Sequence, residues 1–193
     1  LCTATQPALE GIFREFLPER TAVELCPREM FHQEIFQRVT FRREGKLSWE
    51  TVAERIGGQK QALCVVNSRK SAQTVYGLLD KEGAFHLSTL MYPAHRKAML
   101  KEIRARLKDG LPCRVVSTSL IEAGVDVDFP SVFREEAGLD SILQAAGRCN
   151  REGKNASEDS VVTIFQGEAP PPLLFRQPIA AGRTVLSCFE QLD

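Results

Sequence analysis

The residues with the clearest chemical potential lie in the segment QAAGRCNR, which runs from Gln144 to Arg151. Gln144, Arg148 and Arg151 follow one another at i, i+4 and i+7, so on a continuous helix all three project from one face. A guanidinium group is always charged, and its planar set of donors matches the oxygens of a phosphate. The spacing therefore predicts a polyphosphate site on one helix face. A solvated surface helix with two ordinary arginines is the alternative.

A second polar segment, VVSTSLIEAGVDVDF, runs from Val115 to Phe129. Its apolar start predicts a short strand that ends in three successive hydroxyl side chains, and ligands bind at such strand ends in open α/β sheets. Gly124 would let a nucleotide approach the backbone closely, and Asp126 could accept a hydrogen bond from a ribose hydroxyl. The alternative is a hydroxyl-rich helix cap followed by aspartates in a turn.

Short apolar runs and amphipathic segments alternate along the chain. Strands are predicted at residues 22–26, 37–42, 62–67, 85–89, 114–118, 131–135 and 161–165. Helices are predicted at residues 48–56, 71–81, 94–108 and 141–147, with a closing helix within residues 175–192. Buried strands that alternate with helices predict an α/β fold, in which a mostly parallel sheet carries helices on both faces.

Composition narrows the class of function. The formal net charge is zero, so contact with nucleic acid must come from local patches rather than from a basic surface as a whole. The six cysteines form no CxxC pair, which predicts reduced, mostly buried thiols in a cytoplasmic protein. None of the three histidines has metal-ligand spacing, so no metal site is predicted. No apolar run approaches the length of a membrane span.

Four segments occur in the order of motifs III to VI of superfamily 2 helicases: TATQP (Thr3–Pro7), VVNSRKSA (Val65–Ala72), residues 115–129 and QAAGRCNREG (Gln144–Gly153). The long motif V and VI strings resemble the CRISPR-associated helicase-nuclease of type I systems, which is recruited by the Cascade complex. The resemblance runs from Leu1 to about Phe165. Ala123 and the pair Gln144-Ala145 depart from the DEAD-box pattern, which favours the CRISPR-associated family.

The resemblance implies a RecA-like helicase C-terminal lobe. Residues 1–20 are expected to be the end of the first lobe, residues 21–167 the second RecA-like domain, and residues 168–193 a linker and the start of a helical segment. The chain begins without methionine inside a motif, so we expect a fragment of a longer protein.

The resemblance also implies roles for single residues. Arg148 and Arg151 match the arginines that reach the β- and γ-phosphates of ATP, and Gln144 matches the glutamine that orients an arginine or the attacking water. Gly124 and Asp126 match nucleotide-contacting positions of motif V.

Two further residues match positions that contact phosphates of single-stranded DNA, and Arg69 is expected to contact DNA as well. Thr118 matches the motif V threonine, and Ser68, beside Arg69, matches the motif IV hydroxyl. A helix N-cap is the alternative for Ser68, and both roles are compatible. The six basic residues within 94–108 either line a DNA channel or form a solvated charged face.

Several parts of a complete motor are missing from the sequence. A P-loop needs GxxxxGK followed by Ser or Thr, and neither Gly-Lys pair, at 45–46 or 153–154, fits that pattern. No DExH string and no adjacent His-Asp pair is present. The nucleotide grip, the Mg²⁺ ligands and the HD nuclease are therefore expected upstream, and this chain is expected to be inactive alone.

The sequence supports three hypotheses. The first is the second motor lobe of an ATP-dependent, ssDNA-translocating helicase that acts with Cascade in CRISPR interference. The second is the same lobe of another superfamily 2 DNA translocase. The third is a module that binds protein or nucleic acid without hydrolysing ATP.

Overall fold

A computed structural model describes residue 15, residues 37–121 and residues 124–188 of the chain. The chain divides into two compact units, residues 1–37 and residues 38–193. Only Glu15 and Gln37 of the first unit are described, so the strand expected at residues 22–26 and the motif III residues lie outside the described part.

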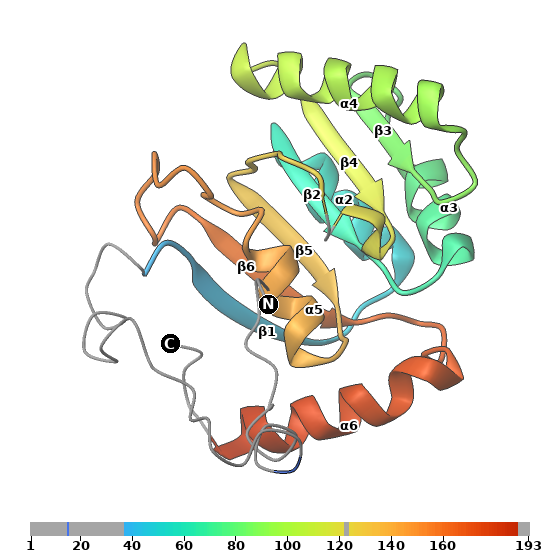
Figure 1. The fold of residues 1–193 in the computed structure, drawn as a ribbon, viewed down its shortest axis with the longest axis vertical. Helices are drawn as coiled ribbons and strands as arrows, with labels where there is room; N and C mark the ends of the chain where they lie inside the picture. The colour runs from blue at the N-terminus through green and yellow to red at the C-terminus, as the bar shows by residue number, and fades with distance from the viewer. Residues whose placement is uncertain (1–14, 16–36, 122–123, 189–193) are drawn as a thin grey trace. The chain divides into compact units, whose positions relative to one another are not determined.

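The second unit is built on one six-stranded sheet (Figure 1). Its strands are β1 (Thr40–Lys46), β2 (Gln61–Val65), β3 (Ala84–Leu87), β4 (Cys113–Ser117), β5 (Ser131–Glu135) and β6 (Val161–Gln166). The strand order is β1-β6-β5-β2-β4-β3, and each neighbouring pair is parallel. This arrangement confirms the predicted α/β fold with a parallel sheet.

Helices cover both faces of the sheet, as the sequence predicts. The helices are α2 (Trp49–Gly57), α3 (Arg69–Leu78), α4 (Pro93–Lys108), α5 (Leu139–Ala146) and α6 (Leu173–Cys188). Ala62 and Cys64 of β2 share a core with residues of α2 and α3, whereas Leu63 and Val65 share the opposite core with residues of α4 and α5. Alternate side chains of a strand point to opposite faces, so an apolar strand buried on both sides needs both layers.

Most element boundaries differ from the predictions by a few residues. The helix expected from residue 71 begins at Arg69, because the Ser68 hydroxyl caps it by accepting a hydrogen bond from the Ser71 N–H at 3.0 Å. The first described strand begins at Thr40 rather than at residue 37. Helix α6 begins one residue after Pro172 and confirms the expected closing helix.

Cys64, Cys113 and Cys149 are buried and form no disulfide. Burial raises the pKa of the Cys113 and Cys149 thiols to about 12. They therefore stay protonated and act as small packing side chains. For these three residues the prediction of buried thiols is confirmed.

A buried polar cluster at the carboxyl ends of β2 and β5 holds the chain just before Ser68. The Glu135 carboxylate accepts a hydrogen bond from the Asn67 N–H at 2.6 Å. Arg134 has no exposed surface, and its Nη1 donates to Asn67 Oδ1 and to the Glu135 carbonyl, each at 2.8 Å. A Cβ at position 167 would come within 2.6 Å of Glu135 Oε1, so Gly167 gives the carboxylate its space.

Burial raises the pKa of Glu135, against the opposing effects of the Asn67 N–H and of Arg134. A raised pKa in the folded state favours the protonated carboxyl, whose contribution to stability is complete below the unfolded-state pKa of about 4.3. That contribution is lost as the pH rises through the folded-state pKa.

We therefore predict that Glu135→Gln, which stays neutral and keeps an oxygen for Asn67, leaves the free energy of unfolding at pH 7 equal to or above that of the wild type. The difference should vanish toward pH 4. Urea unfolding of this chain between pH 4 and pH 8 checks this, with the exposed Glu158→Gln as the control. A Glu135→Gln variant that is less stable than the wild type at pH 7, but not at pH 4, contradicts the prediction.

Candidate nucleotide and DNA site

Helix α5 positions the arginine segment but does not contain it. The helix buries Ile142, Ala145 and Ala146 and ends at Ala146, with the Gly147 N–H donating to the Leu143 carbonyl at 2.8 Å. Arg148 and Arg151 therefore lie in the turn that follows. The prediction that Gln144 and both arginines share one face of a single helix is wrong, because beyond Gly147 the backbone pairs with another part of the chain.

That pairing joins the arginine turn to Phe129, at the end of the motif V segment. The Phe129 N–H donates to the Arg148 carbonyl at 2.9 Å, and its carbonyl accepts from the Asn150 N–H at 3.0 Å. Asn150 is buried with a φ of 46°, a left-handed conformation in which asparagine is favoured among non-glycine residues. Its amide donates to the carbonyls of Arg38 and Asn155, each at 2.8 Å. Sequence reasoning missed this role of Asn150.

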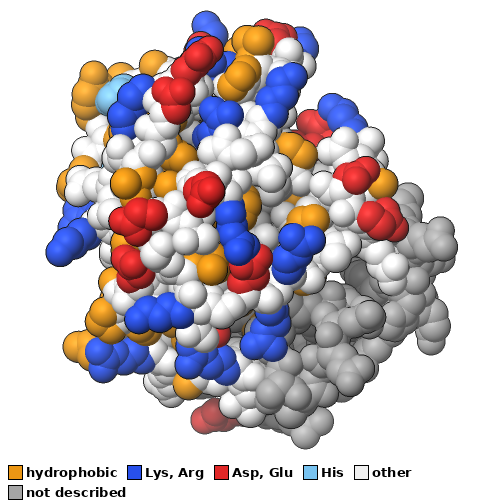
Figure 2. Space-filling view, turned by 180° about the vertical axis from the view of Figure 1, so that it is seen from behind, with side chains coloured by type: hydrophobic (Ala, Val, Ile, Leu, Met, Phe, Trp, Pro, Cys, Tyr) orange, Lys and Arg blue, Asp and Glu red, His pale blue; other side chains and the backbone are white. Residues whose placement is uncertain are grey.

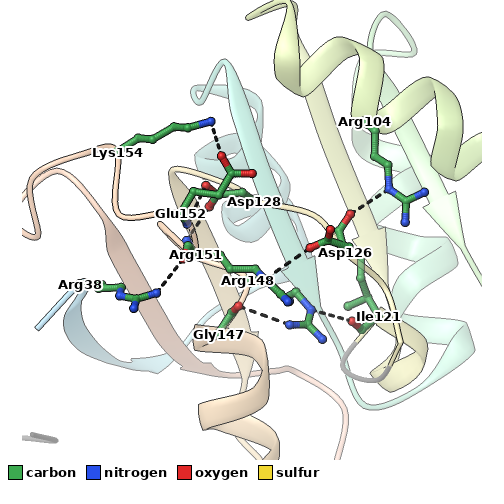
Figure 3. Close-up of polar contacts among 10 residues, drawn as sticks. All are labelled: Arg38, Arg104, Ile121, Asp126, Asp128, Gly147, Arg148, Arg151, Glu152 and Lys154. Atoms are coloured by element: carbon green, nitrogen blue, oxygen red, sulfur yellow. Dashed lines mark hydrogen bonds and ion pairs between the residues drawn. The ribbon is translucent and has the colours of Figure 1, made fainter. Parts of the chain in front are cut away.

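Both arginine side chains reach the motif V segment (Figure 3). Arg148 Nε donates to the Ile121 carbonyl at 3.2 Å. Arg151 Nε lies 3.4 Å from Asp126 Oδ1, and the two side chains are 44% and 80% exposed. An ion pair this exposed contributes about 1 kcal/mol or less, so an incoming phosphate can replace it. The structure thus brings together the predicted nucleotide residues of motifs V and VI.

In residues 125–129 of the motif V segment, the side chains alternate between core and solvent. Val125, Val127 and Phe129 are buried, so the aspartates between them face outward. Gly124 precedes this run with a φ of +70°, a left-handed conformation that glycine adopts at no steric cost. Arg104 of α4 fixes the segment from the other side, since its Nε donates to the Asp126 carbonyl at 2.9 Å.

Asp128 holds the turn that carries Arg151. Its Oδ1 accepts from the Arg151 N–H at 2.7 Å, and its Oδ2 accepts from the Glu152 N–H at 3.2 Å. Sequence reasoning noted this aspartate but gave it no role. The alternation of apolar and acidic residues was the available signal, because it places both aspartates on the exposed side of the segment.

Gln144 lies apart from this cluster. It is half-buried on α5, about one turn before Arg148. Among the described residues, its amide makes no hydrogen bond with Arg148 or Arg151.

The predicted DNA residues lie at the carboxyl edge of the sheet. Ser68 follows β2 and Thr118 follows β4, and these strands end side by side because Val65 pairs with Ser117. Ser68 is the N-cap of α3, which confirms that alternative and leaves the phosphate role a prediction. Arg69 is exposed in the first turn of α3, and Thr118 is 8% exposed.

The surface charge is mixed, as the zero net charge requires. Figure 2 shows Lys and Arg side chains interspersed with Asp and Glu over one face. The described residues contain no group of three His, Cys, Asp or Glu side chains placed to hold a metal ion. Within the same residues, no helix has the length and apolar character needed to cross a membrane.

The chain matches the family model for the C-terminal region of the CRISPR-associated nuclease/helicase Cas3 over residues 58–154. The Cas3 nuclease/helicase of Haloferax volcanii is 37% identical over 89 residues, which are 45% of this chain and 10% of that protein. The chain thus matches only a small part of this relative's length.

Two solved structures share the fold at 18% sequence identity. The crystal structure of T. fusca Cas3-ATP aligns with a TM-score of 0.56 over 76% of this chain and 20% of its own. A chain of a CRISPR RNA-guided surveillance complex in the pre-nicking state aligns with a TM-score of 0.58 over 80% of this chain and 23% of its own. Both likenesses confirm the RecA-like α/β fold. Since the family model spans half of the chain and includes both the motif V segment and the arginine turn, this chain belongs to the Cas3 family of CRISPR-associated nuclease/helicases, as part of its C-terminal helicase region.

Proposed function

We propose that this chain is the second motor lobe of an ATP-dependent helicase that translocates along single-stranded DNA in CRISPR interference. The observation that carries the proposal is the convergence of Arg148, Arg151 and Asp126 on one exposed site, held by the backbone pairing at Phe129. The related T. fusca structure is described as Cas3-ATP, which supports ATP as the ligand of this site.

Arg148 and Arg151 act as arginine fingers in this proposal. ATP would bind between this lobe and a first RecA-like lobe, whose P-loop would hold the β-phosphate and whose acidic residues would hold Mg²⁺, which would offset phosphate charge. The two guanidinium groups stabilise charge that develops on the transferred phosphoryl group, an effect of roughly 10³–10⁵ in rate. Gly124 and Asp126 contact the nucleotide from the motif V side, and Gln144 orients an arginine or the attacking water.

DNA binds at the carboxyl edge of the sheet, through Ser68, Arg69 and Thr118. A motor that moves along DNA must read the phosphate backbone rather than the bases, because it meets every sequence. Ser68 and Thr118 follow neighbouring parallel strands, and the strand spacing of about 4.8 Å supports contacts with adjacent phosphates of one DNA strand.

The proposed partners are those that membership of the Cas3 family implies. We propose that the first lobe and the HD nuclease domain belong to the same cytoplasmic protein, and that Cascade delivers its target DNA. The likeness to a chain of a CRISPR RNA-guided surveillance complex supports this assembly.

We predict that this chain alone hydrolyses no ATP, with or without ssDNA. Adding the upstream part of the protein should give ssDNA-stimulated hydrolysis, because the P-loop and Mg²⁺ ligands then complete the site. Phosphate release, measured for each part and for the mixture, checks this; the covalently intact helicase is the control for parts that fail to associate. Robust hydrolysis by this chain alone, or none by the intact helicase, contradicts the proposal, and the latter favours a module that only binds.

We predict that Arg148→Ala in the intact helicase lowers kcat for ATP by about 10³-fold and leaves ssDNA affinity nearly unchanged. The physical reason is that the guanidinium acts on transition-state charge, whereas the proposed DNA contacts are made by Ser68, Arg69 and Thr118. Steady-state hydrolysis and fluorescence anisotropy with labelled oligonucleotide check the two quantities. The exposed Arg43→Ala on β1 is the matched control. Near-normal turnover of Arg148→Ala removes the arginine-finger role.

We predict that Asp128 is a positioning residue for Arg151. Asp128→Ala in the intact helicase should lower kcat by about tenfold to about a hundredfold, since a displacement of about 1 Å at a reacting group has that effect. Asp128→Asn keeps one acceptor oxygen for the Arg151 N–H and should recover much of the loss.

The exposed Asp159→Ala is the matched control for Asp128. Measuring kcat, KM and the melting temperature of each variant separates positioning from folding. If kcat falls equally in Asp128→Ala and Asp128→Asn, and the melting temperatures fall with it, Asp128 has a purely structural role.

A further inference from the structure

A pair of exposed aromatic side chains lies at the start of α4. Tyr92 is the N-cap residue of this helix and is 67% exposed. Its ring centroid lies 5.5 Å from that of His95, which is also exposed, with the ring planes tilted by 38°. The preceding turn is ordered by Ser88, whose carbonyl accepts from the Met91 N–H at 3.1 Å and whose hydroxyl accepts from the Leu90 N–H at 3.3 Å. The ring of Tyr92 is thus presented to solvent from a hydrogen-bonded turn.

The topology places this pair beside the proposed DNA contacts. β3 is the neighbour of β4, and Leu87 pairs with Ser117, so the turn that carries Tyr92 leaves the sheet next to Thr118. Pro93, the residue after Tyr92, lines the same surface groove as Leu120. The edge therefore presents, in spatial order, Ser68 after β2, Thr118 after β4 and the Tyr92 turn after β3.

The groove beside Tyr92 is basic. It has a volume of about 390 Å³ and lies between α4 and the motif V segment. Its cationic lining residues are Arg96, Lys97 and Arg104, and none of the lining residues that the structure describes is acidic. Arg104 already donates its Nε–H to the Asp126 carbonyl. Arg96 and Lys97 lie closer to Tyr92 in the sequence, so they are the groups that we expect to bind phosphate. Aromatic rings beside cations match single-stranded DNA, whose bases stack and whose phosphates are anionic.

We propose that Tyr92, backed by His95, is a stacking platform for a base of the bound DNA strand, with the neighbouring phosphates held by Arg96 and Lys97. This inference deepens the proposed function and rests on it, because it requires that ssDNA runs along the Ser68–Thr118 edge. Stacking on an aromatic ring is tolerant of sequence, since every base has a π-face, and it therefore suits a translocating motor. Each step of one nucleotide exchanges one stacked base for the next.

The test compares two 12-nucleotide probes in the intact helicase: oligo(dT) and an oligonucleotide of the same length whose nucleotides are all abasic. Tyr92→Leu removes the ring but keeps an apolar side chain, and it should weaken oligo(dT) binding by about fivefold to about a hundredfold. The same variant should bind the abasic probe as the wild type does. Tyr92→Phe keeps the ring and should bind both probes normally.

Two control variants make the result specific. Thr118→Ala removes a proposed phosphate contact and should weaken the binding of both probes equally. Leu90→Ala removes a neighbouring apolar side chain, which is 72% exposed, and leaves the Tyr92 ring in place. Equal weakening of both probes by Tyr92→Leu, or no weakening of either, overturns the stacking role. Loss of binding to the surveillance complex in both Tyr92→Leu and Leu90→Ala, at unchanged oligo(dT) affinity, overturns it in favour of a protein-docking surface. If the wild-type helicase binds neither probe, that result contradicts the proposed function itself, and the stacking platform falls with it.

Discussion

The backbone pairing between Phe129 and the turn at residues 148–150 is the constraint on which the candidate nucleotide site depends. Its two hydrogen bonds, at 2.9 and 3.0 Å, join the end of motif V to the start of the arginine turn. Phe129 has no exposed surface, and a buried backbone group left without its partner costs about 1–3 kcal/mol. The register is therefore fixed by main-chain atoms and core packing. Arg148 and Arg151 take their direction from this pairing.

The sheet was predictable because its strands carry their own signal. β2 is apolar at successive positions, and such a run is buried on both faces only in a parallel sheet covered by two layers of helices. The capped start of α3 at Ser68 is likewise a local signal. The predicted boundaries of helices and strands differ from the observed ones by a few residues where a capping residue or a proline, rather than the apolar periodicity, determines the end of an element.

The helix predicted at residues 141–147 already ends before Arg148, but the i, i+4 and i+7 spacing suggested that the helix continues to Arg151, and the position of the arginine turn could not be predicted from that spacing. From Gln144 to Arg151 the positions i, i+4 and i+7 fit one face, yet the structure ends the helix at Ala146. What ends it is a partner at Phe129, far away in sequence, together with an asparagine in a left-handed conformation. Local periodicity holds no information about such a partner. The role of Asp128 was hidden for the same reason, because its carboxylate binds backbone N–H groups more than 20 residues away.

The motif V segment runs from the carboxyl edge of the sheet to the arginine turn. It starts at Thr118, at the carboxyl edge where the proposed DNA contacts lie, and it ends at Phe129, against the arginine turn. Arg148 binds the Ile121 carbonyl near one end of the segment, and Arg151 binds Asp126 near the other. Under the proposed function, a γ-phosphate that draws both guanidinium groups must release or strain these two contacts. Since the same short segment also carries Thr118, the proposed function links nucleotide binding to the proposed phosphate contact through this segment.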